Sequence, residues 1–182
     1  MEYISTRNTQ KTFSFKDVFL KGLAPDGGLF VPKKIPLYTS QELERLRNLS
    51  YNDLATKIIL KFCSDEFNET EVKDLVDSSY KNFRVKDVVA IKKLGKINLL
   101  ELFHGPTLAF KDIAMQVIGN MYENILEKNK LKVNVVVATS GDTGAAAIGA
   151  IKNRQNIKIF ILHPENKISE VQRKFMTTVN SS

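Results

Sequence analysis

Two short segments carry the residue types that could do chemistry in this chain. The first, HGPTLAFKD, spans residues 104–112 and contains Lys111, and the second, TSGDTG, spans residues 139–144. Each lies between the carboxyl end of a predicted strand and the start of a predicted helix, which is where ligands bind in open α/β sheets. Both segments are therefore candidate parts of a binding site.

Lys111 is a candidate nucleophile because it falls in the first turn of a predicted helix, in a turn flanked by apolar residues. The positive end of the helix dipole disfavours a cation there, and desolvation acts in the same direction, so both would lower the pKa of the amine. A neutral amine can attack an aldehyde and form a Schiff base. The alternative is a surface lysine at a helix start, which this segment alone would favour because single motifs are weak evidence.

The second segment predicts an anion site, formed by Thr139, Ser140, Gly141, Asp142 and Thr143. Glycine lets the backbone approach a ligand closely, and hydroxyls together with backbone N–H groups at a helix N-terminus bind anions. The alternative, compatible with ligand binding, is that Ser140 or Asp142 caps a structural helix. The pattern is neither a Walker A loop, since no Gly-Lys-Ser/Thr follows, nor the Gly-x-Ser-x-Gly of a hydrolase.

The elements that must position these segments alternate along residues 91–182. The β-branched run VNVVVA suits a strand buried on both faces, as in a parallel sheet, and the apolar residues that follow Phe110 recur at helical spacing. We therefore predict an α/β domain with a parallel sheet and helices on both faces, incomplete in this chain. Its strands are predicted at 97–103, 133–138 and 157–162, and its helices at 110–128, 143–153 and 168–179.

Residues 1–90 predict a small, mainly helical domain that carries no chemical constellation. It opens with GLAPDGGLFVP (22–32), whose glycines, proline and aspartate predict a tight turn before a short strand. Apolar residues at helical spacing then predict helices that begin after Thr39-Ser40 and cover about 51–62 and 69–82.

Composition narrows the class of protein. Apolar residues make up 43% and charged residues 26%, as in soluble globular proteins, and neither an export signal nor a membrane-spanning run is evident. Cys63 is the only cysteine, which excludes an intrachain disulfide and suggests a reducing, cytoplasmic setting. The net charge of +7 comes from scattered lysines without interleaved aromatic residues, so we expect neither a nucleic-acid nor a membrane partner.

Four motifs in order resemble the threonine synthase family. They are GLAPDGGLFVP, HGPTLAFKD, SGDTGAAA and LHPENKISEVQ, and the likeness runs from about Tyr3 to the last residue. This family belongs to the fold type II enzymes that use pyridoxal 5'-phosphate, the group of the tryptophan synthase β-subunit. The resemblance implies a carbon–oxygen lyase acting on a phosphate ester, which converts O-phospho-L-homoserine and water to L-threonine and phosphate.

The resemblance also implies roles for individual residues. Lys111 would bind the cofactor and then move protons at the α and β carbons of the substrate. The segment from Thr139 to Thr143 would hold the substrate carboxylate. Sister families often carry Asn where this chain has Asp142, in contact with the 3′-oxygen of the cofactor, and a carboxylate there would be repelled unless a proton is shared.

The two histidines are not expected to be catalytic or to bind a metal. His104 is tempting as a general base, but Lys111 already supplies the proton shuttle, so we prefer that His104 shapes the turn. His163 ends the last predicted strand and is interpreted as structural. Two isolated histidines and one cysteine form no spacing typical of metal ligands.

The family's chains are considerably longer than this one. A glycine-rich loop for the cofactor phosphate and a residue facing the pyridine nitrogen are both absent here, so we interpret the chain as a partial sequence that is inactive alone. Two other interpretations stay open: another fold type II enzyme such as a threonine or serine dehydratase, and a non-catalytic anion-binding module. The sequence leaves the oligomeric state undetermined.

Overall fold

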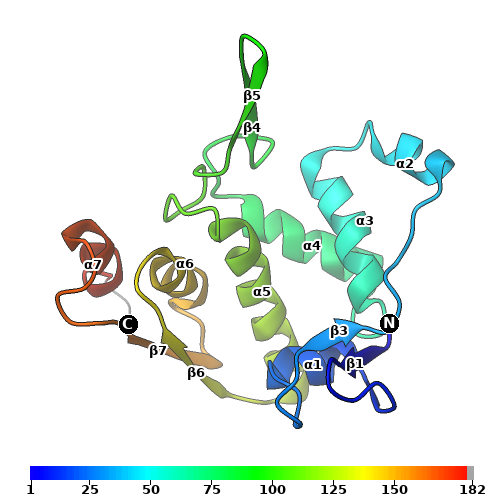
Figure 1. Cartoon of the computed structure of the whole chain (residues 1–182), viewed down its shortest axis with the longest axis horizontal. Helices are drawn as coiled ribbons and strands as arrows, with labels where there is room; N and C mark the ends of the chain where they lie inside the picture. Colours follow the sequence, from blue (N-terminus) through cyan, green and yellow to red (C-terminus); the bar gives the residue numbers. More distant parts are fainter. Residues whose placement is uncertain (180–182) are drawn as a thin grey trace. The chain divides into compact units, whose positions relative to one another are not determined.

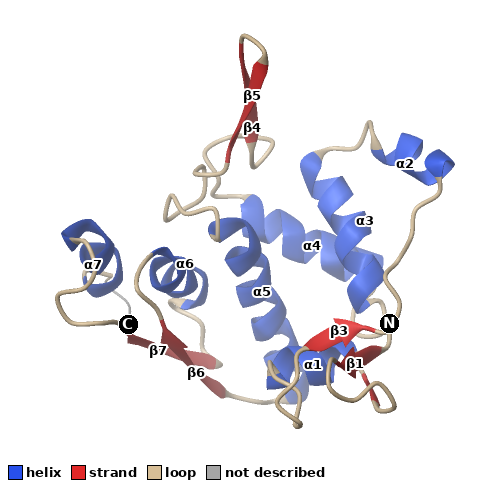
Figure 2. Ribbon diagram, in the orientation of Figure 1, coloured by secondary structure: helices blue, strands red, loops and turns tan. Residues whose placement is uncertain are grey.

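The computed structural model describes residues 1–179, which form two compact units, one of Met1–Asp77 and one that begins at Ser78. Figure 1 follows the chain through its elements, and Figure 2 separates helices from strands. Helix α4 (Glu69–Tyr80) crosses from one unit into the next. The domain boundary at residue 90 stays a prediction.

The N-terminal unit contains a small antiparallel sheet that the sequence analysis only partly predicted. Its strands are β1 (Tyr3–Ser5), β2 (Thr12–Phe13) and β3 (Phe30–Pro32), in the order β2-β1-β3. Only β3 was expected, as the strand after the turn at 22–32. Strands of two or three residues are too short for an alternating pattern to show in the sequence.

The predicted turn at 22–32 folds back onto β1 through Asp26. Its carboxylate accepts hydrogen bonds from the Ser5 hydroxyl at 2.7 Å and from the Gly28 N–H at 2.9 Å. These two bonds, the Ser5 bond foremost, hold the pKa of Asp26 below its usual value. A Cβ at Gly28 would lie 2.3 Å from Ser5 Oγ, so the turn docks closely enough to require glycine.

The N-terminal unit contains three helices that begin at side-chain caps, and a fourth helix extends beyond it. Helix α2 begins after Thr39, which forms a reciprocal capping box with Glu42, as the predicted cap required. Ile58, one of the apolar residues whose spacing predicted α3 with this side inward, is 40% exposed, so that expectation was wrong for this residue. The helices are α1 (Phe15–Lys21), α2 (Ser40–Leu46), α3 (Tyr51–Cys63) and α4.

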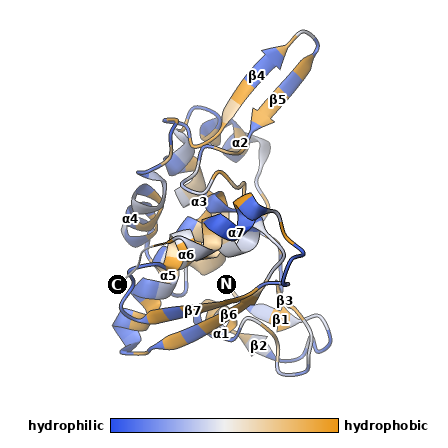
Figure 3. Cartoon of the chain, turned by 90° about the vertical axis from the view of Figure 1, so that its left-hand side faces the viewer, coloured by the Kyte–Doolittle hydropathy of each residue, from blue (hydrophilic) through white to orange (hydrophobic). Residues whose placement is uncertain are grey.

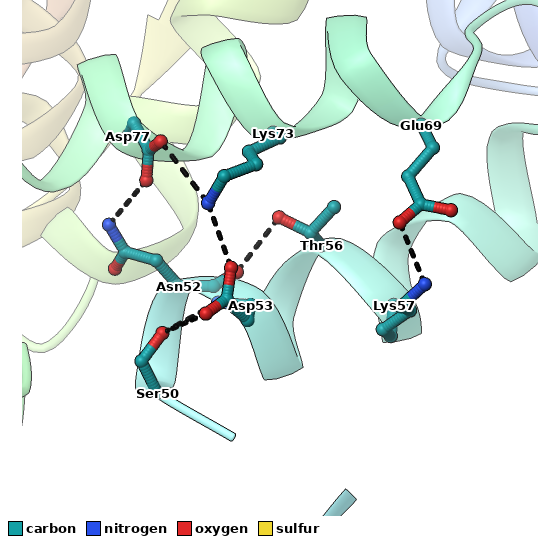
Figure 4. Close-up of polar contacts among 8 residues, drawn as sticks. All are labelled: Ser50, Asn52, Asp53, Thr56, Lys57, Glu69, Lys73 and Asp77. Atoms are coloured by element: carbon teal, nitrogen blue, oxygen red, sulfur yellow. Dashed lines mark hydrogen bonds and ion pairs between the residues drawn. The ribbon is translucent and has the colours of Figure 1, made fainter.

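An ion-pair network joins α3 to the part of α4 that lies in this unit (Figure 4). Lys73 Nζ lies 2.8 Å from Asp53 Oδ1 and 3.5 Å from Asp77 Oδ2, and Asn52 donates to Asp77 at 2.8 Å. Another face of α4 is apolar, and Val72 on it is fully buried. The helix therefore presents one charged and one buried face.

The second unit contains a hairpin and a parallel strand pair. Helix α6 packs against α5 and β7, and β6 and β7 run parallel in register from Val133↔Ile157 to Ala138↔Leu162. The elements are β4 (Ala90–Leu94), β5 (Ile97–Glu101), α5 (Asp112–Asn129), β6 (Val133–Ala138), α6 (Asp142–Ile151), β7 (Ile157–Leu162) and α7 (Glu170–Thr177).

The strand predicted at 97–103 was wrongly assigned to the parallel sheet. It forms β5 and pairs antiparallel with β4, with Ile97 opposite Leu94. Gly95, at φ +61°, begins the two-residue turn between them. Such a turn needs a positive φ at its first central residue, and Gly-Lys between two apolar runs was a hairpin signal.

The parallel pair is covered on one face among residues 1–179. Alternate residues of both strands are exposed, including Val136 at 62% and Phe160 at 53%. Figure 3 shows the helices α5, α6 and α7 gathered on the same side of β6 and β7. The expectation that VNVVVA is buried on both faces was therefore wrong for this chain, and the described part shows no helix on the second face.

Candidate functional site

The first predicted segment is a loop between β5 and α5, and a buried carboxylate fixes its shape. Asp112 is fully buried and accepts hydrogen bonds from the backbone N–H and the hydroxyl of Thr107, both at 2.7 Å. A Cβ at Gly105 would lie 2.4 Å from the Cβ of Asp112. The loop thus turns tightly around this side chain, and only glycine fits at position 105.

Leu108, at the apex of this loop, has φ +64°. This left-handed conformation is uncommon for residues other than glycine and often marks a functional constraint. The N–H of Leu108 donates to the Gly105 carbonyl at 3.2 Å, which closes the turn. The backbone is held in a costly conformation just ahead of the predicted nucleophile.

Lys111 stands at the N-cap position of α5, one residue before the helix proper. It is half-buried, and its Nζ lies 4.2 Å from the centre of the Phe110 ring. The cap makes no side-chain hydrogen bond, so Lys111 does not serve as a structural cap of the helix. Its side chain is placed by packing on an aromatic face.

The second predicted segment continues from β6 into α6. The Thr139 N–H donates to the carbonyl of Leu162, the last residue of β7, at 2.9 Å. The Gly141 N–H donates to the Thr139 hydroxyl at 3.2 Å. Gly141 is the N-cap of α6 and supplies no side-chain cap. The alternative that Ser140 or Asp142 caps this helix is therefore wrong, and Ser140 is exposed.

Both segments line one cavity of about 170 Å³ within the second unit. Its walls come from three places: the loop before α5, the start of α6, and one side of α7. Of the predicted site residues, Gly141 and Asp142 line it, while Lys111, Thr139, Ser140 and Thr143 do not. The lining residues are Thr107, Leu108, Ala109, Gly141, Asp142, Ala145, Val171, Gln172 and Phe175.

Helix α7, to which no role was assigned from the sequence, supplies a third of this lining. Gln172 donates from its Nε2 to Asp142 Oδ1 at 3.2 Å. The signal that could have found it was present, since Gln172 ends the motif LHPENKISEVQ.

His104 takes part in a chain of polar contacts at the base of the hairpin. Its Nε2 lies 2.9 Å from Glu101 Oε2, and Lys92 Nζ lies 2.8 Å from Glu101 Oε1. The hydrogen bond from Lys92 is the main reason that the pKa of Glu101 lies below its usual value, although burial acts against it. The geometry fits a residue that bonds beside the turn.

Two further absences hold for residues 1–179. No three side chains of the His, Cys, Asp and Glu types gather closely enough there to bind a metal ion. Within the same residues, every helix is too short or too polar to cross a membrane.

Comparison with known proteins shows where this architecture occurs. Residues 2–80 match the family described as threonine synthase N terminus. A threonine synthase of Pseudomonas aeruginosa is 43% identical over 180 residues, which cover 98% of this chain. The chain is related to the N-terminal portion of threonine synthases.

Solved structures agree with this relationship. The crystal structure of threonine synthase from yeast matches 99% of the chain with a TM-score of 0.93 at 39% identity. A threonine synthase from Brucella melitensis with bound pyridoxal phosphate matches 97% with a TM-score of 0.90 at 40% identity. The chain spans only about 38% of the length of each of these relatives.

Proposed function

We propose that this chain is the N-terminal part of a threonine synthase, which converts O-phospho-L-homoserine and water to L-threonine and phosphate with pyridoxal 5'-phosphate. One observation carries the proposal. Two segments about thirty residues apart in the sequence line a single cavity, in a chain that matches a pyridoxal-phosphate-bound threonine synthase with a TM-score of 0.90.

The residues present suit this cofactor. Lys111 offers an amine at the start of α5, and α6 begins without a side-chain cap, as a helix end that receives an anionic group would. A Cβ at Gly141 would lie 2.6 Å from Gln172 Nε2, so the position requires glycine where this side chain packs on the N-cap of α6. In this arrangement Lys111 and Asp142 are the residues that would contact the cofactor, which supplies an electron sink for the reaction when bound.

The side chains of this chain would then do three things. Lys111 takes protons from, and returns them to, the α and β carbons of the substrate. The segment Thr139–Thr143 binds the substrate carboxylate through hydroxyls and backbone N–H groups. The buried pair of Asp112 and Thr107 holds the loop that carries Lys111, so that the amine stays within reach of the reacting carbons.

The remaining features belong to the whole protein. Further strands and helices would cover the exposed face of β6 and β7, giving a parallel sheet with helices on both faces. Residues 1–90 would form the N-terminal domain and residues 91–182 the first part of the cofactor-binding domain. We place the enzyme in the cytoplasm, with a small-molecule substrate and without a nucleic-acid or membrane partner.

The test uses the full-length protein that contains this chain. Wild type should release phosphate from O-phospho-L-homoserine and little ammonia from threonine, and borohydride reduction should attach the cofactor to the peptide that contains Lys111. Lys111→Ala should lose the visible absorption band and at least about a hundredfold of the activity. The exposed Lys132→Ala serves as the matched control and should retain both. Ammonia release without phosphate release would favour a dehydratase, and a cofactor attached elsewhere would contradict the assignment of Lys111.

A further inference from the structure

We infer that Gln172 is a positioning residue, which fixes the carboxylate of Asp142 in the orientation that the cofactor or substrate meets. The inference rests on the proposed function and adds a residue to its site. It begins from the contact between Gln172 Nε2 and Asp142 Oδ1 at 3.2 Å, which joins the first turns of α7 and α6.

The orientation of the Gln172 amide is determined by its other end. Its Oε1 accepts hydrogen bonds from the backbone N–H of Ser169 at 3.3 Å and from the Ser169 hydroxyl at 3.2 Å. The backbone N–H of Gln172 donates back to the same hydroxyl at 3.2 Å, which completes a capping box. Because the cap uses the amide oxygen, the amide nitrogen must face Asp142, and a flipped amide would set two oxygens against each other.

Two neighbouring contacts hold α7 where this bond can form. A Cβ at Gly141 would lie 2.6 Å from Gln172 Nε2, so the amide rests directly over the backbone of the N-cap. One turn further along α7, Met176 is buried, and a Cβ at Gly144 would lie 2.5 Å from its sulfur. Helix α7 therefore packs on α6 at two points, Gln172 against Gly141 and Met176 against Gly144.

The bond has a consequence for a ligand in the cavity. A carboxylate beside an anionic oxygen is unfavourable, and an N–H donor lowers that cost by sharing the negative charge of one carboxylate oxygen. Gln172 donates a hydrogen bond to Oδ1 of Asp142, so Oδ2 is the carboxylate oxygen without this bond. Without the amide donor, Asp142 would be free to rotate and would carry its full charge toward the ligand.

The decisive variant is Gln172→Glu in the full-length protein. Glutamate also forms the capping box, so the start of α7 is kept, but the N–H donor becomes a carboxylate oxygen that repels Asp142. We expect affinity of the apo-protein for pyridoxal phosphate to fall about tenfold, as for loss of a hydrogen bond to a charged group. We also expect the pH profile of the bound cofactor's absorption to shift.

Two companion variants separate positioning from a structural role. Ser169→Ala removes the hydroxyl of the cap but keeps the backbone N–H that holds Gln172 Oε1, so it should lower the unfolding temperature while leaving the pH profile in place. Adding Asp142→Asn to Gln172→Glu restores a donor and an acceptor with exchanged roles, and should recover most of the lost affinity.

The outcomes distinguish this inference from the proposed function. If wild type binds the cofactor at Lys111 but Gln172→Glu matches wild type in affinity and pH profile, the positioning role is wrong and the function stands. If wild type binds no cofactor, the function fails, and a cycle of wild type, Gln172→Glu, Asp142→Asn and the double variant decides the contact itself. A non-additive effect on the unfolding temperature of the apo-protein supports it, and simple additivity overturns it.

Discussion

At the scale of single residues, the buried carboxylate of Asp112 shows how the predicted nucleophile is positioned. A fully buried charged group is costly unless it is hydrogen-bonded, and Asp112 receives two bonds from Thr107, five residues earlier. The same interaction ties the start of the loop to the residue immediately after Lys111. A solvated ion pair at this position would have left the loop free to move.

Asp112→Ala should therefore destabilise the protein. The substitution leaves the Thr107 N–H without its acceptor, and an unsatisfied buried donor costs about 1–3 kcal/mol. Urea unfolding of the variant should show this loss, whereas Glu127→Ala, an exposed position on the same helix, should change stability little. Equal effects of the two substitutions would contradict the assigned role of Asp112.

Cys63 leads to a prediction on pH dependence. Its side chain is fully buried, and burial raises the pKa of the thiol to about 12. In the unfolded chain the pKa of a thiol is about 8.5. Between about pH 8.5 and about 12, the thiol of Cys63 is therefore ionised in the unfolded state and protonated in the folded state. The stabilising contribution of the neutral thiol is complete below about pH 8.5 and is lost as pH rises toward 12.

We expect the free energy of unfolding to decline above about pH 8.5, and to decline less steeply in Cys63→Ala. A thiol reagent at pH 8 should label the native protein slowly and the urea-unfolded protein at once. Rapid labelling of the native state would show that the thiol is accessible. Equal slopes for both proteins would show that the titration of Cys63 does not cause the decline.

The site residues that the sequence could predict are those inside motifs. Lys111 and Asp142 stand in segments whose glycines and hydroxyls indicate a ligand. The sequence could not indicate that Asp112 is buried, because an acidic residue beside a lysine looks like a solvated pair. Nor could it place Gln172 against Asp142, thirty residues away, because that contact depends on how α7 packs on α6.

At the scale of elements, caps and periodicity predicted the longer helices and strands of both units. Thr39 marked the start of α2, and the runs that became β6 and β7 were predicted with their observed bounds. The strands β1 and β2, of three and two residues, offered too few positions for a pattern. The hairpin of β4 and β5 was missed because its first strand, 90–94, carries two adjacent lysines, Lys92 and Lys93, and so shows no alternation, although the Gly-Lys turn after it was a signal.

Gly28 tests how the turn at 22–32 docks on β1. A Cβ there would lie 2.3 Å from Ser5 Oγ and 3.0 Å from Asp26 Oδ1, so Gly28→Ala forces these groups apart. Overpacking of this kind costs about 1–3 kcal/mol. Because the closest clash is with the hydroxyl, Ser5→Ala should be less harmful in the Gly28→Ala background than in wild type, as measured by urea unfolding.

Gly95 provides the matched control for this cycle. The φ of +61° at position 95 favours glycine, and a Cβ there would meet no other group within 4 Å. Gly95→Ala should therefore be strained by its backbone conformation alone. Its cost should be the same with and without Ser5→Ala. Strict additivity of Gly28→Ala and Ser5→Ala would mean that the turn moves away from β1 instead of meeting it.

At the scale of the whole molecule, exposed apolar surface competes with net charge. The outer face of β6 and β7 exposes Val136, Phe160 and Leu162, and Val136 and Phe160 are direct neighbours across the parallel pair. Both strands of a two-stranded sheet also present an unpaired edge, which favours pairing with another chain. The net charge of +7 opposes association by repulsion between chains.

The 182-residue chain on its own should therefore self-associate, and more so as salt is added. Salt screens the repulsion between chains, with a Debye length that falls from about 10 Å at 0.1 M to about 3 Å at 1 M, but leaves the apolar attraction in place. Sedimentation velocity at several protein concentrations should show larger species at high salt. Val136→Lys places a charge in the middle of the exposed face and should shift the distribution toward monomer, whereas Asn48→Lys, which adds the same charge at an exposed position outside that face, should shift it much less. A chain that stays monomeric at every concentration and salt level would mean that the sheet face is less available than its exposure indicates, and that no further segment is needed to cover it.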